Sequence, residues 1–204
     1  MARSHGRIHS AIWSDPDFLA LEVGPQRMYM FLLSQPNLNH AGLLPLTMNR
    51  WASRCRGMTA AMVRADLEVL AAARFIVLDF EAEELLIRTL VRGDGVYRQP
   101  LVMKRLVEDA QEITSAKLRV ALLLELARLP FDGLSDEPTG KDKRGPSVRA
   151  VALESTEAIR GAFGDPPALP PPDPPERVSE TLPGGSGDGS PIPSPRTRAH
   201  PPSP

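Results

Sequence analysis

Arginine is the residue type with which this sequence could do chemistry, and its arginines gather in two short segments. Residues 47–64 contain no acidic residue and four arginines, Arg50, Arg54, Arg56 and Arg64. Residues 88–105 contain Asp94 as their one acid beside five basic residues, Arg88, Arg92, Arg98, Lys104 and Arg105. The first 130 residues together carry 16 basic and 14 acidic side chains. Local clusters on a nearly neutral chain indicate a localised anionic partner, such as the phosphates of nucleic acid.

No pattern in the sequence is typical of an enzyme. Cys55 is the single cysteine, which excludes an internal disulfide and a zinc site built from thiolates. His5 and His9 are weak evidence for a metal site, because no carboxylate or thiol accompanies them. The sequence has neither a glycine-rich phosphate loop nor a Ser/His/Asp set with supporting context. We therefore predict no catalytic residue, no cofactor and no metal ion.

Composition divides the chain near residue 130. Residues 131–204 hold 16 of the 22 prolines and 9 of the 15 glycines. About a third of that segment is therefore Pro or Gly, as in disordered or linker sequence, and we expect a disordered tail with at most a transient helix over 148–163. No apolar run approaches the ~20 residues of a membrane helix, and no apolar stretch follows the first residues as a secretory signal requires. We expect a soluble, cytoplasmic protein that does not contact a membrane.

The first elements of the chain are expected to be short. Residues 7–13 alternate imperfectly and predict a short strand or extended arm. Ser14-Asp15-Pro16 can cap and begin a short helix, because a proline at the first helical position loses no hydrogen bond. A second helix is predicted to begin at Gly24-Pro25 and to end before Pro36. Residues 41–44 are apolar and precede a proline, which suits a brief edge strand.

Two helices around a tight turn are expected next. Thr47 can cap a helix that runs to about Arg56, and Gly57 can end it. Thr59 can then cap a second helix over residues 60–74, whose apolar residues form one stripe. Two helices separated by a glycine-containing turn form a helix-turn-helix unit.

A β-hairpin is predicted to follow the helix-turn-helix. Residues 75–80 and 85–91 are rich in strand-forming residues and flank a short polar link. The order helix, strand, helix, turn, helix, hairpin is the winged-helix arrangement, and it defines a first domain over residues 1–95. The predicted wing tip, residues 81–84, carries three acids, Glu81, Glu83 and Glu84. These carboxylates repel phosphate, so the tip is not expected to enter a DNA groove.

Two more helices are predicted over residues 96–130, which we treat as a helical extension. One begins near Pro100, and the other is capped by Ser115 and runs to about Leu129 with many leucines. The sequence allows these helices either to pack back on the domain or to form a surface for a partner. Residues 131–204 form the expected Pro/Gly-rich tail.

Several segments resemble a known class of proteins. They are Arg7–Asp15, Arg27–Pro36, His40–Leu46 and Glu84–Arg92. These segments resemble small helix-turn-helix DNA-binding proteins of actinobacteria and their phages. They are more distantly similar to the N-terminal winged-helix modules of phage replisome organisers and DnaD-type replication initiation proteins. The resemblance covers roughly residues 5–130, and it implies a winged-helix fold and DNA binding.

These observations together predict a double-stranded DNA-binding surface. The candidate DNA-binding residues are Arg50, Arg54, Arg56, Thr59, Arg64, Arg88 and Arg92. Arg50 and Arg54 are four apart, so a continuous helix would place both on one face, where a phosphate would relieve their repulsion. Arg64 is the one strong base or phosphate donor expected on the second helix. Few side chains on this surface can hydrogen-bond to bases. Recognition of a particular DNA sequence would therefore need a homodimer, DNA shape or a partner.

Three functions remain open at this point. One is replication initiation, in which the domain recruits a replication protein through residues 100–130 or through the tail. The second is transcriptional regulation by a DNA-bound dimer. The third is an interaction adaptor that touches no nucleic acid, which the acidic wing tip and the Pro-rich tail favour and the basic clusters disfavour.

Overall fold

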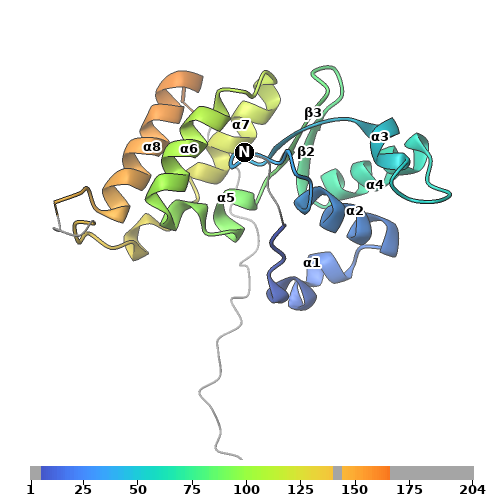
Figure 1. Ribbon diagram of the computed structural model, residues 1–204, viewed down its shortest axis with the longest axis horizontal. Helices are drawn as coiled ribbons and strands as arrows, with labels where there is room; N and C mark the ends of the chain where they lie inside the picture. The colour runs from blue at the N-terminus through green and yellow to red at the C-terminus, as the bar shows by residue number, and fades with distance from the viewer. Residues whose placement is uncertain (1–5, 140–143, 166–204) are drawn as a thin grey trace, which may run out of the picture. The chain divides into compact units, whose positions relative to one another are not determined.

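The computed structural model describes residues 6–139 and 144–165, which form a mainly helical fold with one small antiparallel sheet (Figure 1). The helices are α1 Pro16–Leu19, α2 Val23–Leu33, α3 Met48–Ala52, α4 Ala60–Ala72, α5 Leu90–Gly93, α6 Pro100–Ala110, α7 Ala116–Leu126 and α8 Val148–Phe163, with 3-10 turns η1 Ser10–Ser14, η2 Val96–Arg98 and η3 Phe131–Gly133. The strands are β1 Leu43–Pro45, β2 Ile76–Asp79 and β3 Glu84–Ile87, in the spatial order β1-β3-β2. The predicted mainly helical class with a β2–β3 hairpin is confirmed.

The sheet separates two hydrophobic cores, because its central strand is apolar on both faces. Leu85 of β3 pairs with Leu44 of β1 and faces the first core, whereas the next residue, Leu86, pairs with Leu43 and faces the second. Successive strand residues point to opposite faces of a sheet, which explains the alternation. All four residues of β3 are buried, so the hairpin lies inside the fold and has helices on both faces.

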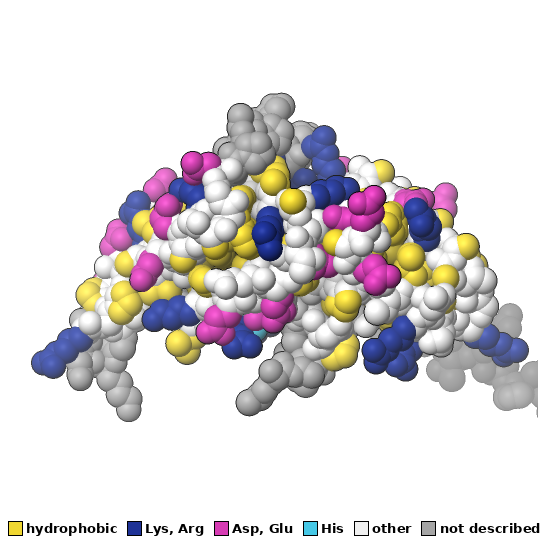
Figure 2. Space-filling model, turned by 90° about the horizontal axis from the view of Figure 1, so that it is seen from above, with side chains coloured by type: hydrophobic (Ala, Val, Ile, Leu, Met, Phe, Trp, Pro, Cys, Tyr) yellow, Lys and Arg dark blue, Asp and Glu magenta, His cyan; other side chains and the backbone are white. Residues whose placement is uncertain are grey.

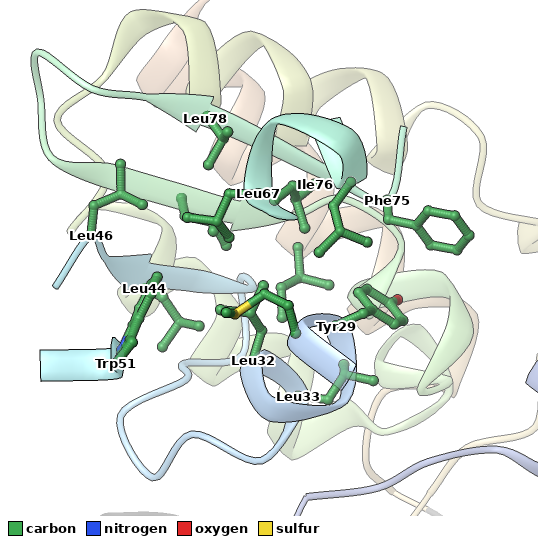
Figure 3. Close-up of a cluster of buried hydrophobic side chains, with 14 of the residues drawn as sticks. Tyr29, Leu32, Leu33, Leu44, Leu46, Trp51, Leu67, Phe75, Ile76 and Leu78 are labelled. Atoms are coloured by element: carbon green, nitrogen blue, oxygen red, sulfur yellow. The ribbon is translucent and has the colours of Figure 1, made fainter. Parts of the chain in front are cut away.

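The first core lies between the sheet and helices α2, α3 and α4. Along α4 the buried side chains are Val63, Leu67 and Leu70, a helical spacing that places one stripe against the sheet. Figure 3 shows Leu67 directed toward the strand residues Leu44 and Ile76. This stripe orients α4, so the opposite face of the helix is presented to solvent.

The second core lies on the other face of the sheet and is built from α6, α7 and α8, which lie side by side in Figure 1. The leucines predicted for the residue 115–129 helix are buried there, namely Leu118, Leu122, Leu123 and Leu126. Ser115 is the N-cap of α7, and its hydroxyl oxygen accepts a hydrogen bond from the Leu118 N–H at 3.2 Å. The extension therefore packs back on the sheet.

Ordered structure continues beyond residue 130, where the sequence predicted the start of a disordered tail, because α8 lies in this segment. Ser147 caps this helix by accepting a hydrogen bond from the Ala150 N–H at 3.0 Å. Its buried side chains are Val151, Ala152, Ser155, Thr156 and Ile159. The helix expected over residues 148–163 is present with those bounds, and it is ordered by packing on α6 instead of being transient. The rest of the predicted tail, residues 166–204, lies outside the described residues.

Three predicted elements differ in the structure. Residues 7–13 form no strand, because they have no partner strand among the described residues, and η1 occupies their second half. The helix expected to reach Arg56 ends at Ala52, after which the chain forms tight turns. The strand predicted over residues 85–91 ends at Ile87, and the chain then forms α5. Leu90 of α5 is buried in the first core and Val91 in the second.

Substituting a core residue of α8 tests whether this helix is part of the folded unit. We expect Ile159→Ala to lower the free energy of unfolding by about 2–5 kcal/mol, because it removes buried methylene groups and leaves a cavity. Leu153→Ala, on the exposed face of the same helix, is the control and should change it by about 0.5 kcal/mol or less. Urea denaturation of the full chain measures both. Equal effects of the two variants would contradict the packing of α8.

Candidate nucleic-acid interface

Three of the predicted arginines lie together on α3 and the turn that leads to α4. Arg50 is on α3, and Arg54 and Arg56 lie in the turn, which Gly57 completes with φ of +82°. All three arginine side chains are exposed. None of them forms an ion pair with any residue in the described part of the chain. Because α3 ends before Arg54, Arg50 and Arg54 do not share the face of one continuous helix.

Thr59 and Arg64 lie where the sequence placed them, at the start of α4. The Thr59 hydroxyl oxygen accepts a hydrogen bond from the Met62 N–H at 3.2 Å, which confirms the predicted N-cap. Arg64 Nε donates to Glu68 Oε1 at 2.9 Å, and its guanidinium carbon lies 4.1 Å from the centre of the Phe80 ring. Arg64 is therefore exposed but engaged on two sides.

Arg88 and Arg92 lie apart from this group, around a buried carboxylate. Glu125 of α7 is 1% exposed, and its Oε1 lies 3.0 Å from both Arg88 Nε and Arg128 Nη1. Arg92 Nη2 lies 3.8 Å from the other carboxylate oxygen. A buried carboxylate needs partner charges to offset its lost hydration. Arg88 and Arg92 are partly buried and ion-paired with this carboxylate, and we leave them out of the candidate interface.

Glu84 does not lie on the hairpin tip, where the sequence placed it. It is buried on β3, and its carboxylate accepts hydrogen bonds from the Thr114 and Ser115 N–H groups, both at 3.0 Å, and from the Thr114 hydroxyl at 2.7 Å. These donors stand at the start of α7, where unpaired N–H groups favour a negative charge. The tip retains two exposed acids, Glu81 and Glu83.

Two further contacts hold the hairpin against α7. The Ser115 hydroxyl donates to Asp79 Oδ2 at 2.5 Å, and Lys117 Nζ donates to the Leu78 carbonyl at 2.8 Å. The hydrogen bond from Ser115 lowers the pKa of the Asp79 carboxyl, with the Ala82 and Glu81 N–H groups acting in the same direction. The hairpin is therefore fixed to the second core by its last strand residues and has little freedom to reach outward.

One histidine is oriented by a carboxylate, but no catalytic arrangement surrounds it. His40 Nδ1 lies 2.7 Å from Asp109 Oδ2, and the His40 N–H donates to the same oxygen at 2.8 Å. No hydrogen bond joins the His40 ring to a Ser, Thr or Cys side chain within residues 6–139 and 144–165. The contact attaches the loop before β1 to α6, which is a structural role.

Neither a metal cluster nor a membrane-spanning helix is found in the part of the chain that the structure describes. No three His, Cys, Asp or Glu side chains of that part are grouped to hold an ion. Its helices all lack the combined length and hydrophobicity needed to cross a bilayer.

Basic and acidic side chains are interspersed over much of the face in Figure 2.

Comparison of the chain with protein-family models, with curated proteins and with solved structures found no match. We therefore infer the function from the positions and contacts of the side chains. Sequence reasoning missed Glu125 and the capping role of Glu84, the two carboxylates that decide where the hairpin and α5 lie. A glutamate inside the leucine-rich stripe of residues 118–126 was the one available signal, because a charge at a core position requires a partner.

Removing the buried carboxylate should destabilise the whole fold. We expect Glu125→Ala to lower the free energy of unfolding by about 3–5 kcal/mol, because it removes the buried carboxylate on which three partly buried arginines converge. Glu68→Ala, which breaks an exposed pair with Arg64, should cost about 1 kcal/mol or less. Urea denaturation measures both, and Glu125→Gln provides an intermediate if the alanine variant does not fold. Similar values for Glu125→Ala and Glu68→Ala would contradict this assignment.

The lowered pKa of Asp79 predicts a loss of stability in acid. A carboxylate whose folded pKa lies below its unfolded value of about 3.9 stabilises the fold above that pH, and this contribution disappears as the pH falls through the folded pKa. We expect Asp79→Asn to be less stable than the parent chain at neutral pH, with the difference shrinking in acid. Denaturation midpoints measured across this range test it. A difference that is independent of pH would exclude the mechanism.

Proposed function

We propose that this chain binds duplex DNA through a winged-helix domain and acts in replication initiation, by recruiting a replication factor to the DNA it occupies. Support for the winged-helix assignment comes from the order α2, β1, α3, α4, β2, β3 and from the sheet order β1-β3-β2. In this assignment α3 and α4 are the helix-turn-helix, α4 enters the major groove and the β2–β3 hairpin is the wing.

The exposure of Arg50, Arg54 and Arg56 is the observation that carries the proposal. Like-charged side chains within seven consecutive residues of α3 and one turn, with no acid of the described chain paired to them, would be stabilised by an external anion. Phosphates along a DNA strand supply several anions at regular spacing, and contacts of this kind position a protein on the duplex. The Thr59 hydroxyl and the first N–H groups of α4 add donors beside them.

The wing contributes little to this mode of binding. Its tip carries Glu81 and Glu83, which repel phosphate, and the strand ends next to that tip are held against α7 by Glu84 and Asp79. Binding through the helix-turn-helix without the wing would be weak and would show little dependence on sequence. A partner protein or a homodimer would supply the missing affinity and specificity.

The helices on the far side of the sheet are the proposed recruiting element. α6, α7 and α8 are firmly packed, yet they present apolar side chains to solvent, among them Leu101, which is 83% exposed. The resemblance to replisome organisers favours replication over transcriptional regulation by a dimer.

A protein-interaction adaptor is the second candidate, and one observation favours it. Arg88 and Arg92, two of the seven predicted DNA contacts, are occupied by Glu125. Salt separates the two candidates, because phosphate contacts weaken steeply as salt rises and apolar contacts do not.

The test is a fluorescence-anisotropy titration of the full chain with a labelled random-sequence duplex over a series of salt concentrations. We expect affinity to fall steeply with salt, and Arg54→Ala to reduce the slope of log affinity against log salt by about 0.9, the value for one phosphate contact. Arg50→Glu combined with Arg54→Glu should abolish binding without changing the circular dichroism spectrum.

Lys104→Ala is the matched control, because it removes one exposed charge from α6 on the other side of the sheet. It should leave the salt slope unchanged. A parent chain that binds no duplex even at low salt would favour the adaptor instead.

A further inference from the structure

Four apolar side chains lie on the solvent side of α4, beside the exposed ion pair of Arg64 and Glu68. The stripe Val63, Leu67 and Leu70 is buried, and the opposite face presents Ala61, Met62, Ala65 and Val69. Met62 is 50% exposed and Val69 44% exposed, so both large hydrophobic side chains are accessible to a ligand. This face, defined by Ala61, Met62, Ala65 and Val69, lies directly after the turn that carries Arg54 and Arg56.

The polar side chains that border this face are engaged with each other. Arg64 donates to Glu68, and its guanidinium covers the Phe80 ring. A helix that distinguishes bases by hydrogen bonds carries Arg, Asn, Gln or a free carboxylate toward the groove floor. Ala61, Met62, Ala65 and Val69 carry no side-chain donor or acceptor of this kind, so they can contact bases only through apolar atoms.

Charge complementarity identifies the occupant of this face. Arg50, Arg54 and Arg56 are exposed beside it and suit the phosphates that border a DNA groove. The apolar group that the major groove offers between those phosphates is the C5-methyl of thymine, which is commonly contacted by alanine and other apolar side chains. We propose that the apolar face of α4 contacts thymine methyl groups, so that the chain prefers thymine-rich major grooves. This inference rests on the DNA binding proposed above.

The contact can be tested by removing the methyl group alone. Deoxyuridine pairs as thymidine does but lacks the C5-methyl, so two duplexes of one A·T-rich sequence, one with thymine and one with uracil, differ only at the proposed contact. Burying one such carbon is worth a factor of about four in affinity. We expect the full chain to bind the thymine duplex about fourfold more tightly for each methyl contacted. Methylating C5 of cytosine in a G·C duplex should increase the affinity in the same way.

A variant assigns the preference to α4. Met62→Ser keeps the backbone N–H that Thr59 caps and replaces an exposed side chain, so the fold should be retained. We expect it to bring the thymine-to-uracil affinity ratio toward one. Leu101→Ser, at an exposed leucine of α6, is the matched control and should leave the ratio unchanged. Circular dichroism verifies that both variants are folded.

Each outcome of this experiment decides a separate claim. Salt-dependent binding with equal affinity for the thymine and uracil duplexes would overturn the methyl contact and leave the proposed DNA binding intact. A preference that Met62→Ser does not reduce would overturn its assignment to α4. A change of oligomeric state in Met62→Ser would show that a second copy of the chain covers this face, which also overturns it. Absence of binding to every duplex would refute the DNA binding itself.

Discussion

The buried carboxylate of Glu125 is the constraint on which the arrangement of the molecule depends. An ionised side chain that is 1% exposed must be offset by nearby cations, and three arginines from different parts of the chain meet it. Arg88 follows β3, Arg92 lies on α5, and Arg128 follows α7. Because all three must reach one point, the chain leaves the sheet after β3, and α7 is held against the sheet at its C-terminal end. The two cores are thereby joined.

Carboxylates also hold the N-terminal end of α7, but there they accept hydrogen bonds instead of pairing with arginines. Glu84 and Asp79, at the end of the hairpin, accept hydrogen bonds from the residues that begin this helix. α7 therefore contacts the hairpin at both ends, and the hairpin cannot move away from the second core without exposing unpaired carboxylates. This explains why the proposed DNA surface is limited to α3, the turn and α4.

Local patterns identified most of the elements. The apolar stripe of residues 60–74 predicted α4, the two β-rich runs predicted the hairpin, and Thr59 and Ser115 were recognised as caps, because each signal lies within a few residues. The errors have equally specific causes. The helix over residues 148–163 was expected to be only transient, because the packing on α6 that orders it acts between distant parts of the chain. Glu84 was counted with the hairpin tip because its partners, Thr114 and Ser115, lie about 30 positions later in the chain.

The sequence by itself determined the mainly helical class, the order of elements from α2 to the hairpin and the clustering of arginines, because helix periodicity, caps and turns act between neighbours. It could not determine which arginines remain available to a ligand. Arg50 and Arg88 look alike in the sequence, yet one is exposed and the other neutralises a carboxylate 37 positions away. That division was decided only by the tertiary structure, because the partner of a buried charge is set by which distant segments the packing brings together.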